Sequence, residues 1–324
     1  MKILITGIAG FIGSNLLDFF LKKGFKVIGL DNFSTGFHFN IQNKLSNRNF
    51  SFLEGDIRNL KDCIKATNGV DYVLHQAALG SVPRSIQDPV TTNEVNISGF
   101  LNMLEASKIN NVKRFIYAAS SSTYGDSESL PKTEEKIGNP LSPYAVTKYV
   151  NELYADIYSR TYNMETIGLR YFNVFGRRQT PNGAYAAVIP KFIKNFLDGE
   201  SPIINGDGSY SRDFTYIDNV LEMNYLAMNT TNSKAINQVY NTAVGDQITI
   251  KQMAELIREE LSSFNKSILN IPILYGPNRD GDIPHSMASI EKAKALLNYS
   301  PSHSFKQGLK ESIKWYFKEL SDER

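Results

Sequence analysis

The stretch "ILITGIAGFIGSN", residues 3–15, joins a short apolar run to three glycines at a spacing of three residues. The apolar run predicts a buried strand, and the glycines predict a tight turn into a helix. Gly7 permits the turn, Gly10 lets the backbone approach a pyrophosphate, and Gly13 allows the helix to pack closely. Because the helix N-terminus would face the anion, the stretch predicts the first strand, turn and helix of a dinucleotide-binding fold.

The ends of the next strands carry polar residues that fit the same ligand. "KVIGLDN", residues 26–32, leads to Asp31, whose carboxylate can accept hydrogen bonds from both ribose hydroxyls of an adenosine. That carboxylate would repel a 2′-phosphate, so NAD is expected in preference to NADP. "GDIRN", with Asp56 and Ile57, and "HQAA", residues 75–78, lie where the third and fourth strands end, at the sheet edge where ligands collect.

The first half of the chain alternates β-branched runs with helical stretches, which is typical of a parallel sheet with right-handed crossovers. Two long stretches, Pro89–Ile109 and Pro143–Tyr162, carry apolar residues at helical spacing and predict helices that cover the sheet. The fold expected is α/β: a Rossmann-type doubly wound parallel sheet in residues 1–170 that also receives a segment near 212–245, with a smaller C-terminal α/β substrate-binding cap in residues 171–324. Strands are expected at residues 2–6, 26–30, 50–53, 71–74, 114–118 and 165–169.

Composition narrows the class of protein. A chain of 324 residues with 42% apolar residues can bury a substantial core. A net charge of +2 without a long basic run lacks the electrostatic footprint of a nucleic-acid-binding protein. Cys63 is the only cysteine, which excludes an intramolecular disulfide, and the four histidines lack the spacing of metal ligands. Glycines interrupt the apolar N-terminus and no apolar run approaches a membrane span, so a cytoplasmic protein without a signal peptide is expected.

Two further motifs supply candidate catalytic groups. "SPYAVTKYVNE", residues 142–152, places Tyr144 and Lys148 four residues apart, on one face of a predicted helix. A phenol with a pKa of about 10 is a poor base at neutral pH, but a neighbouring ammonium and a positive nicotinamide ring favour the phenolate. "YAASSSTYG", residues 117–125, brings serines to a strand end, where hydroxyls can hydrogen-bond a reacting substrate oxygen or relay its proton.

Taken in this order, the Gly-x-x-Gly-x-x-Gly turn, Asp31, the strand-end serines and Tyr-x-x-x-Lys resemble the extended branch of the short-chain dehydrogenase/reductase superfamily. The resemblance covers essentially the whole chain. "LRYFNVFG", residues 169–176, and "RDFTYIDNV", residues 212–220, are similar to motifs of the nucleotide-sugar epimerases and dehydratases in that branch.

The resemblance implies roles for residues of the first half. Ser120, Tyr144 and Lys148 would form the catalytic triad. Ser122 would be a helper. The implied NAD contacts are Gly7, Gly10, Phe11, Ile12, Gly13, Asp31, Asn32, Ser34, Thr35, Gly36, Asp56, Ile57, Gln76, Ala77, Ala78, Tyr144, Lys148, Tyr171 and Val174.

Departures from the branch favour epimerisation over elimination. Sugar 4,6-dehydratases resemble this chain but carry an Asp-Glu pair just after the catalytic Ser or Thr, and UDP-glucuronate decarboxylases usually carry a Glu nearby. This chain has Ser121 and Ser122 there. The groups that remain can remove a proton from O4, move hydride from C4 to NAD and return it to the other face, with Tyr144 as base and later acid. Because the 4-keto sugar must rotate between the transfers, tight binding should fall on the nucleotide diphosphate.

Among epimerases, "GSVPRS", residues 80–85, and "GRRQTPNGAYAAVIPKF", residues 176–192, look most like UDP-N-acetylhexosamine 4-epimerases of bacterial surface-polysaccharide pathways. The expected reaction is therefore the reversible conversion of UDP-GlcNAc to UDP-GalNAc, with UDP-Glc and UDP-Gal as further substrates. "RDGDIPHS", residues 279–286, ends at a gate position, where the small Ser286 leaves room for an acetamido group at C2.

The resemblance also implies substrate contacts. Asn173, Arg212 and Arg279 would bind the diphosphate, for which arginine forks are well suited. Asp282 would accept hydrogen bonds from the hydroxyls of the nucleotide ribose, and Asn205 would contact the uridine. The remaining implied contacts are Gly80, Ser81, Ser120, Ser121, Ser122, Tyr144, Ala187, Val188, Lys191 and Ser286.

Two alternatives stay open. A 4-epimerase of UDP-N-acetylhexosaminuronic acids would need an extra cation near C6, for which Arg84, Arg177 and Arg178 are candidates. A nonenzymatic NAD-binding sensor or scaffold of the same fold would commonly lack the catalytic Tyr or Lys, and both are present here. A homodimer through the two long helices is expected from the resemblance and the apolar spacing, with no metal, nucleic-acid or membrane partner.

Overall fold

A seven-stranded sheet forms the centre of the molecule, in the order β11-β6-β5-β4-β1-β2-β3. The computed structural model describes residues 1–183, 185–278 and 283–322. All pairings in this sheet are parallel, and the strand order reverses beside β1, the type of position at which open α/β sheets bind ligands. The Rossmann-type doubly wound α/β fold is thus confirmed. The strands are β1 (Lys2–Thr6), β2 (Lys26–Asp31), β3 (Phe50–Glu54), β4 (Tyr72–His75), β5 (Arg114–Ser120), β6 (Glu165–Tyr171) and β11 (Gln238–Thr242).

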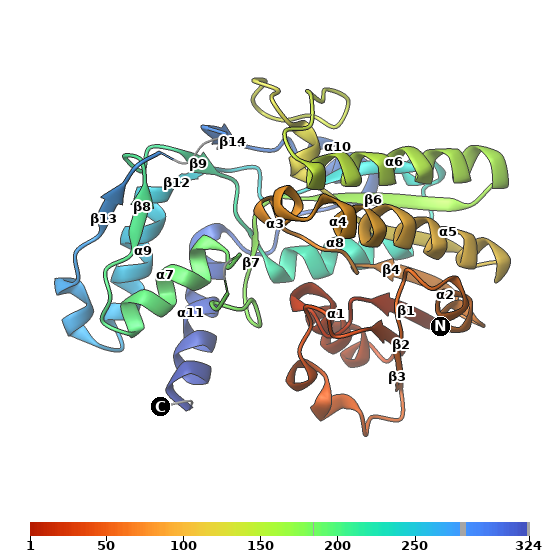
Figure 1. The fold of residues 1–324 in the computed structure, drawn as a ribbon, viewed down its shortest axis with the longest axis horizontal. Coiled ribbons are helices and arrows are strands. Elements are labelled where there is room, and N and C mark those ends of the chain that lie inside the picture. The colour runs from red at the N-terminus through yellow and green to blue at the C-terminus, as the bar shows by residue number, and fades with distance from the viewer. Residues whose placement is uncertain (184, 279–282, 323–324) are drawn as a thin grey trace.

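Helices cover both faces of the sheet (Figure 1). One face packs against α2 (Leu60–Thr67), α5 (Gly99–Ile109) and α6 (Pro143–Tyr162). The other face packs against α1 (Phe11–Lys22) and α8 (Ile217–Asn229). Strand β11 follows α8, so a segment from the second half of the chain returns to the sheet beside β6.

Helix α6 has well-defined ends that fix the position of its side chains. The Ser142 hydroxyl accepts a hydrogen bond from the Ala145 amide, and Pro143 occupies the first turn, where its missing N–H costs nothing. Asn163 ends the helix in the left-handed conformation, with φ of 54°. The prediction of a helix over residues 143–162 is therefore confirmed.

The helix expected over residues 89–109 is instead interrupted. It consists of α4 (Pro89–Asn93), a π-helical turn (Glu94–Ser98) and α5. The wider turn places Asn96 inside, where its side chain accepts from the Leu79 amide at 2.8 Å and donates to the Leu79 carbonyl at 3.2 Å. This contact with a distant loop gives a physical reason for the interruption, because π turns occur where a local helix adapts to a site.

A smaller group of elements lies beside the C-terminal edge of the sheet (Figure 1). Its helices α7, α9 and α11 pack on one another, next to short parallel pairs of strands and one mixed three-stranded sheet. The elements are β7 (Val174–Phe175), α7 (Val188–Leu197), β8 (Ile203–Asn205), β9 (Ser211–Arg212), β10 (Thr215–Tyr216), β12 (Ile248–Thr249), α9 (Ile250–Ser262), β13 (Leu274–Gly276), β14 (His285–Ser286) and α11 (Phe305–Asp322). Outside this group, α10 (Glu291–Leu297) packs against β11, and α3 (Val82–Gln87), which follows β4, packs against α6.

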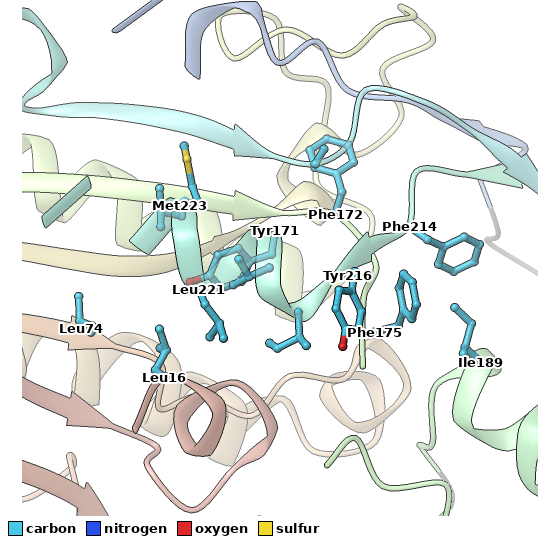
Figure 2. Packing of buried hydrophobic residues seen from close by; sticks show 14 of the residues in the cluster. Leu16, Leu74, Tyr171, Phe172, Phe175, Ile189, Phe214, Tyr216, Leu221 and Met223 are labelled. Atoms are coloured by element: carbon cyan, nitrogen blue, oxygen red, sulfur yellow. The ribbon is translucent and has the colours of Figure 1, made fainter. Parts of the chain in front are cut away.

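One buried cluster runs without a break from the sheet into these elements (Figure 2). Leu16 of α1 and Leu221 of α8 lie at one end, and Ile189 of α7 lies at the other. Phe175 links them, with its ring 5.7 Å from that of Tyr216 and 6.4 Å from that of Phe214. The sheet and the smaller group therefore share a hydrophobic core.

In the part of the chain that the structure describes, no helix has the length and hydrophobicity needed to cross a bilayer. The same residues contain no group of three or more His, Cys, Asp or Glu side chains arranged to hold a metal ion.

Candidate active site

The Gly-rich turn is packed so tightly that side chains would not fit. Gly7 has φ of 66°, and a Cβ added there would lie 2.9 Å from the Ala77 nitrogen. A Cβ on Gly13 would lie 2.1 Å from the Gly7 carbonyl oxygen. Gly10 precedes α1 without a side-chain cap, so the first amides of that helix have no side-chain partner from the N-cap. The turn, closely packed and ending in a helix N-terminus, fits a dinucleotide pyrophosphate.

Asp31 lies at the end of β2 beside that turn. One carboxylate oxygen accepts from the Ala9 amide at 2.9 Å, and the other accepts from the Phe33 amide at 2.8 Å. Burial raises the pKa of Asp31, and these backbone hydrogen bonds oppose the rise. The carboxylate is thus held at the rim of the turn, where the fit to an adenosine ribose requires an acceptor.

Asn32 and Asp56 bring the ends of β2 and β3 together. The Asn32 amide donates to Asp56 at 3.0 Å, and Arg58 forms an ion pair with the same carboxylate at 2.7 Å. The hydrogen bond from Arg58 lowers the pKa of Asp56. Ser34 adds a further link, because its amide donates to the Asn32 side chain at 3.0 Å. Other residues assigned to NAD by the resemblance surround this edge: Phe11 and Ile12 begin α1, Thr35 and Gly36 follow β2, Ile57 lies after β3, and Gln76, Ala77 and Ala78 follow β4.

Thr6 is a site residue that the sequence reasoning missed. Its buried hydroxyl accepts from the amides of Gln76 at 3.2 Å and Ala77 at 3.1 Å, and it bonds Nδ1 of His75 at 2.9 Å. It therefore joins the end of β1, just before Gly7 in the chain, to the end of β4. The sequence signal that could have identified Thr6 is a hydroxyl side chain at the last position of the first strand.

The four predicted catalytic residues are brought together by β5 and α6. The Ser120 hydroxyl oxygen accepts from the Ser122 amide at 3.1 Å and from the Ser122 hydroxyl at 2.8 Å. Burial raises the pKa of Tyr144, and its hydrogen bond with Ser120 opposes that rise. In the polypeptide alone, burial thus outweighs the effect that we expected from the Lys148 ammonium.

Lys148 is almost completely buried, and its ammonium lies 6.0 Å from the centroid of the Tyr144 ring. It donates to the Ala118 carbonyl oxygen at 2.8 Å, which uses one of its three donors. Burial lowers the pKa of Lys148 to about 8, and the charge of Glu152 opposes this change. The site therefore combines a phenol, a hydroxyl pair and a poised amine, the groups needed for proton exchange with a hydroxyl of a substrate.

The loop after β4 is bonded to α6 through Asn96. Asn96, which holds Leu79, also donates to the Thr147 hydroxyl at 3.1 Å. Gly80 and Ser81 follow Leu79 directly, and an added Cβ on Gly80 would meet nothing within 4 Å. These two residues, which the resemblance assigns to the hexose, are thus held next to α6.

Tyr171 does not present its hydroxyl at the sheet edge. The hydroxyl donates to Gln76 at 3.1 Å and accepts from Asn224 of α8 at 2.9 Å, within the core (Figure 2). Burial raises its pKa to about 12. Val174, the other predicted neighbour of the nicotinamide, lies in β7, pairs with Thr215 and is half-buried.

The predicted substrate residues of the second half that the structure describes lie on or beside several short elements. Arg212 in β9 is in register with Ser286 in β14, and Asn173, with φ of 35°, donates to the Asp213 carbonyl oxygen at 2.9 Å. Arg279 and Asp282 lie outside the described residues. Ala187 caps α7, Val188 and Lys191 lie in its first turn, and Asn205 ends β8.

Comparison with known proteins places this geometry in a family. The model of the NAD dependent epimerase/dehydratase family matches residues 3–243. UDP-N-acetylglucosamine 4-epimerase of Methanobrevibacter ruminantium, solved with UDP-N-acetylmuramic acid, is 38% identical with a TM-score of 0.91, covering 98% of each chain.

Two other solved structures differ in substrate. UDP-glucose 4-epimerase of Thermotoga maritima, with UDP-glucose, is 36% identical with a TM-score of 0.90, covering 99% of this chain and 100% of that one. UDP-glucuronic acid 4-epimerase of Bacillus cereus, with UDP-glucuronic acid and NAD, is 32% identical with a TM-score of 0.88 and the same coverage. The dinucleotide that the glycine turn and Asp31 fit is therefore NAD. The chain belongs to the NAD dependent epimerase/dehydratase family.

Proposed function

We propose that the protein is a UDP-sugar 4-epimerase that interconverts UDP-GlcNAc and UDP-GalNAc. The observation that carries the proposal is the gathering of Ser120, Ser122, Tyr144 and Lys148 at the end of β5, two strands away in the sheet from β1 and its glycine turn. The three solved structures described above are 4-epimerases of different UDP-sugars, so the reaction type is better supported than the sugar.

Each of the gathered residues has a distinct role in the proposed reaction. NAD, when bound, supplies the hydride acceptor and donor for C4. The Tyr144 hydroxyl is the group that exchanges a proton with O4, and the Ser120 hydroxyl, oriented by Ser122, hydrogen-bonds the same oxygen. Lys148 places a positive charge beside the phenol, which favours the phenolate during proton removal.

Ser121 and Ser122 distinguish this site from an elimination site. Removal of water across C5 and C6 needs an acid and a base near those atoms. Ser122 is instead engaged with Ser120 through its hydroxyl and amide. This arrangement supports proton exchange at O4 without loss of water.

The charges near the site favour a neutral sugar over a uronic acid. Arg177 pairs with Asp218 at 2.7 Å, and Arg178 pairs with Asp18 at 2.8 Å. Both guanidinium groups are therefore engaged within the protein, which weakens two of the three candidate cations for C6. Arg84 lies over the ring of Tyr185, with its Cζ atom 5.0 Å from the centroid.

The gate position supports the acetylated sugar. Ser286 is half-buried and pairs in register with Arg212, the residue expected at the diphosphate. A small side chain there leaves room for an acetamido group at C2, whereas a bulky one would fill it. A pocket with room for an acetamido group also admits a smaller substituent at C2, so UDP-hexoses without the acetamido group are expected to enter as well.

A substrate panel tests the proposal. Purified protein with NAD is incubated with UDP-GlcNAc, UDP-Glc and UDP-GlcNAcA, and the sugars are separated by anion-exchange chromatography. We expect UDP-GalNAc as the preferred product; preference for the uronic acid would support the alternative that uses Arg84. Binding of NAD without turnover of any UDP-sugar would support the sensor. Tyr144→Phe should retain NAD and lose turnover, and unchanged turnover would refute the role of Tyr144.

A homodimer through α6 is part of the proposal. Val146, Leu153 and Ile157 are 46%, 49% and 45% exposed, and their spacing places them along one side of the helix. Val90 in α4, which contacts α6, is 67% exposed. Apolar side chains exposed in a row on a long helix support a face that pairs with its own copy.

A further inference from the structure

Asp213 is a completely buried carboxylate at a junction of separate chain segments. It lies between β9 and β10 and has no exposed surface. One oxygen accepts from the Val244 amide at 3.0 Å. The other accepts from the Gly245 amide at 3.0 Å and from the Ala288 amide at 3.3 Å.

Segments that meet at Asp213 lead to three residues expected at the UDP-sugar. Arg212 precedes it in the chain, and Ser286 stands two residues before Ala288 and in register with Arg212. Asn173 donates to the Asp213 carbonyl oxygen at 2.9 Å. The carboxylate and the carbonyl of one residue thus connect three substrate-side positions that are far apart in sequence.

The segment that carries Ser286 has a second anchor on its other side. The Lys132 amide donates to the Met287 carbonyl at 2.8 Å, and the Ser289 amide donates to the Lys132 carbonyl at 2.9 Å. The Ala288 amide points the opposite way, to Asp213. Without the carboxylate, this segment would stay attached to Lys132 and to β9, where the Ser211 amide donates to the Pro284 carbonyl at 3.0 Å, but it would lose the hydrogen bond from Ala288 to Asp213.

We propose that Asp213 is a positioning residue for the UDP-sugar, which fixes Arg212, Asn173 and Ser286 relative to one another without touching the substrate. This inference rests on the proposed function. Two acceptor oxygens on a short side chain are needed, because three amides approach from two sides. An amide side chain has one acceptor oxygen, so it would turn an N–H toward one of these donors.

The test is Asp213→Asn in the NAD-loaded protein. We expect the KM for UDP-GlcNAc and the Kd for UDP to rise about tenfold, with kcat changed less than about twofold. The KM ratio of UDP-GlcNAc to UDP-Glc should also change, because Ser286 is expected to sense the C2 substituent. NAD content and the thermal midpoint report whether the protein remains folded.

Asp246→Asn is the matched control, because this exposed carboxylate lies in the turn that Asp213 holds and accepts from Gln247 at 2.8 Å. It should leave all constants unchanged. Ala288→Pro is the second variant, since it removes one of the three amide donors and leaves the carboxylate itself in place. It should raise the Kd for UDP in the same direction.

The outcomes separate the two proposals. A wild-type protein without turnover of UDP-GlcNAc overturns the proposed function, while UDP binding by calorimetry still tests Asp213. Unchanged UDP affinity in a folded Asp213→Asn protein overturns the inference, as does a fall in kcat with unchanged KM. If Asp213→Asn does not fold, unchanged UDP affinity of folded Ala288→Pro overturns it.

Discussion

Replacing Lys148 by methionine should stabilise the folded protein at neutral pH while removing turnover. Lys148 is 3% exposed, and burial lowers its pKa from 10.5 to about 8. Because the unfolded chain holds this proton more tightly, the charged amine costs the folded state about 3 kcal/mol at pH 7. Methionine keeps the unbranched stem but loses the hydrogen bond to the Ala118 carbonyl, worth about 1 kcal/mol. The expected net gain is about 2 kcal/mol.

The sign of the effect depends on pH. A lowered pKa means that the penalty is fully present below pH 8 and disappears as the unfolded chain loses its proton near pH 10.5. The difference in unfolding free energy between Lys148→Met and wild type should thus fall from about 2 kcal/mol at pH 7 to about zero at pH 9.5. Urea unfolding followed by circular dichroism measures it, on dinucleotide-free protein because bound ligand adds stability of its own.

Lys65→Met is the control, because Lys65 is an exposed lysine on α2. Its unfolding free energy should change by less than about 0.5 kcal/mol at both pH values. Turnover of Lys148→Met in saturating NAD should fall at least about a hundredfold. Two results would contradict the reasoning: Lys148→Met is less stable than wild type at pH 7, or the difference in unfolding free energy between the two does not vary with pH. Either result would show that burial does not lower the pKa of Lys148.

Three further predictions concern the cofactor and the assembly. Gly13→Ala places a Cβ 2.1 Å from a backbone carbonyl oxygen of the turn, so it should abolish NAD content measured after purification, whereas Gly80→Ala, with open space around it, should retain it. Asp31→Asn removes the negative charge at the ribose, so the preference for NAD over NADP in fluorescence titrations should fall about tenfold; an unchanged ratio contradicts the assigned role. Ile157→Glu puts a charge into the exposed apolar row of α6 and should give a monomer in light scattering, and a dimer of unchanged stability would exclude this face.

The sequence predicted the parts of the fold that depend on local pattern. The strands at residues 2–6 and 50–53 and the helix at 143–162 follow from periodicity and from end signals such as Ser142, Pro143 and Asn163. The local pattern placed the serines at a strand end and Tyr144 on a helix, whereas their gathering at one site was expected from the family resemblance.

Features that depend on contacts between distant segments escaped prediction. The π-helical turn contains Asn96, whose side chain accepts a hydrogen bond from Leu79 in another loop. The inward direction of the Tyr171 hydroxyl depends on Asn224, a residue of α8. The pairing of Arg178 with Asp18 joins residues that are 160 positions apart, and no local pattern carries that information.

The shared core of Figure 2 bears on how specificity can be altered in this protein. Phe175, Phe214 and Tyr216 pack in one cluster with side chains from the sheet. The elements of the smaller group therefore cannot be exchanged as an independent unit. A graft taken at residue 170 would leave an unmatched apolar surface on both partners and would compromise folding before it changed the sugar. New specificity is therefore better sought in short surface segments, such as residues 80–81 and 284–286, which can change while the core remains intact.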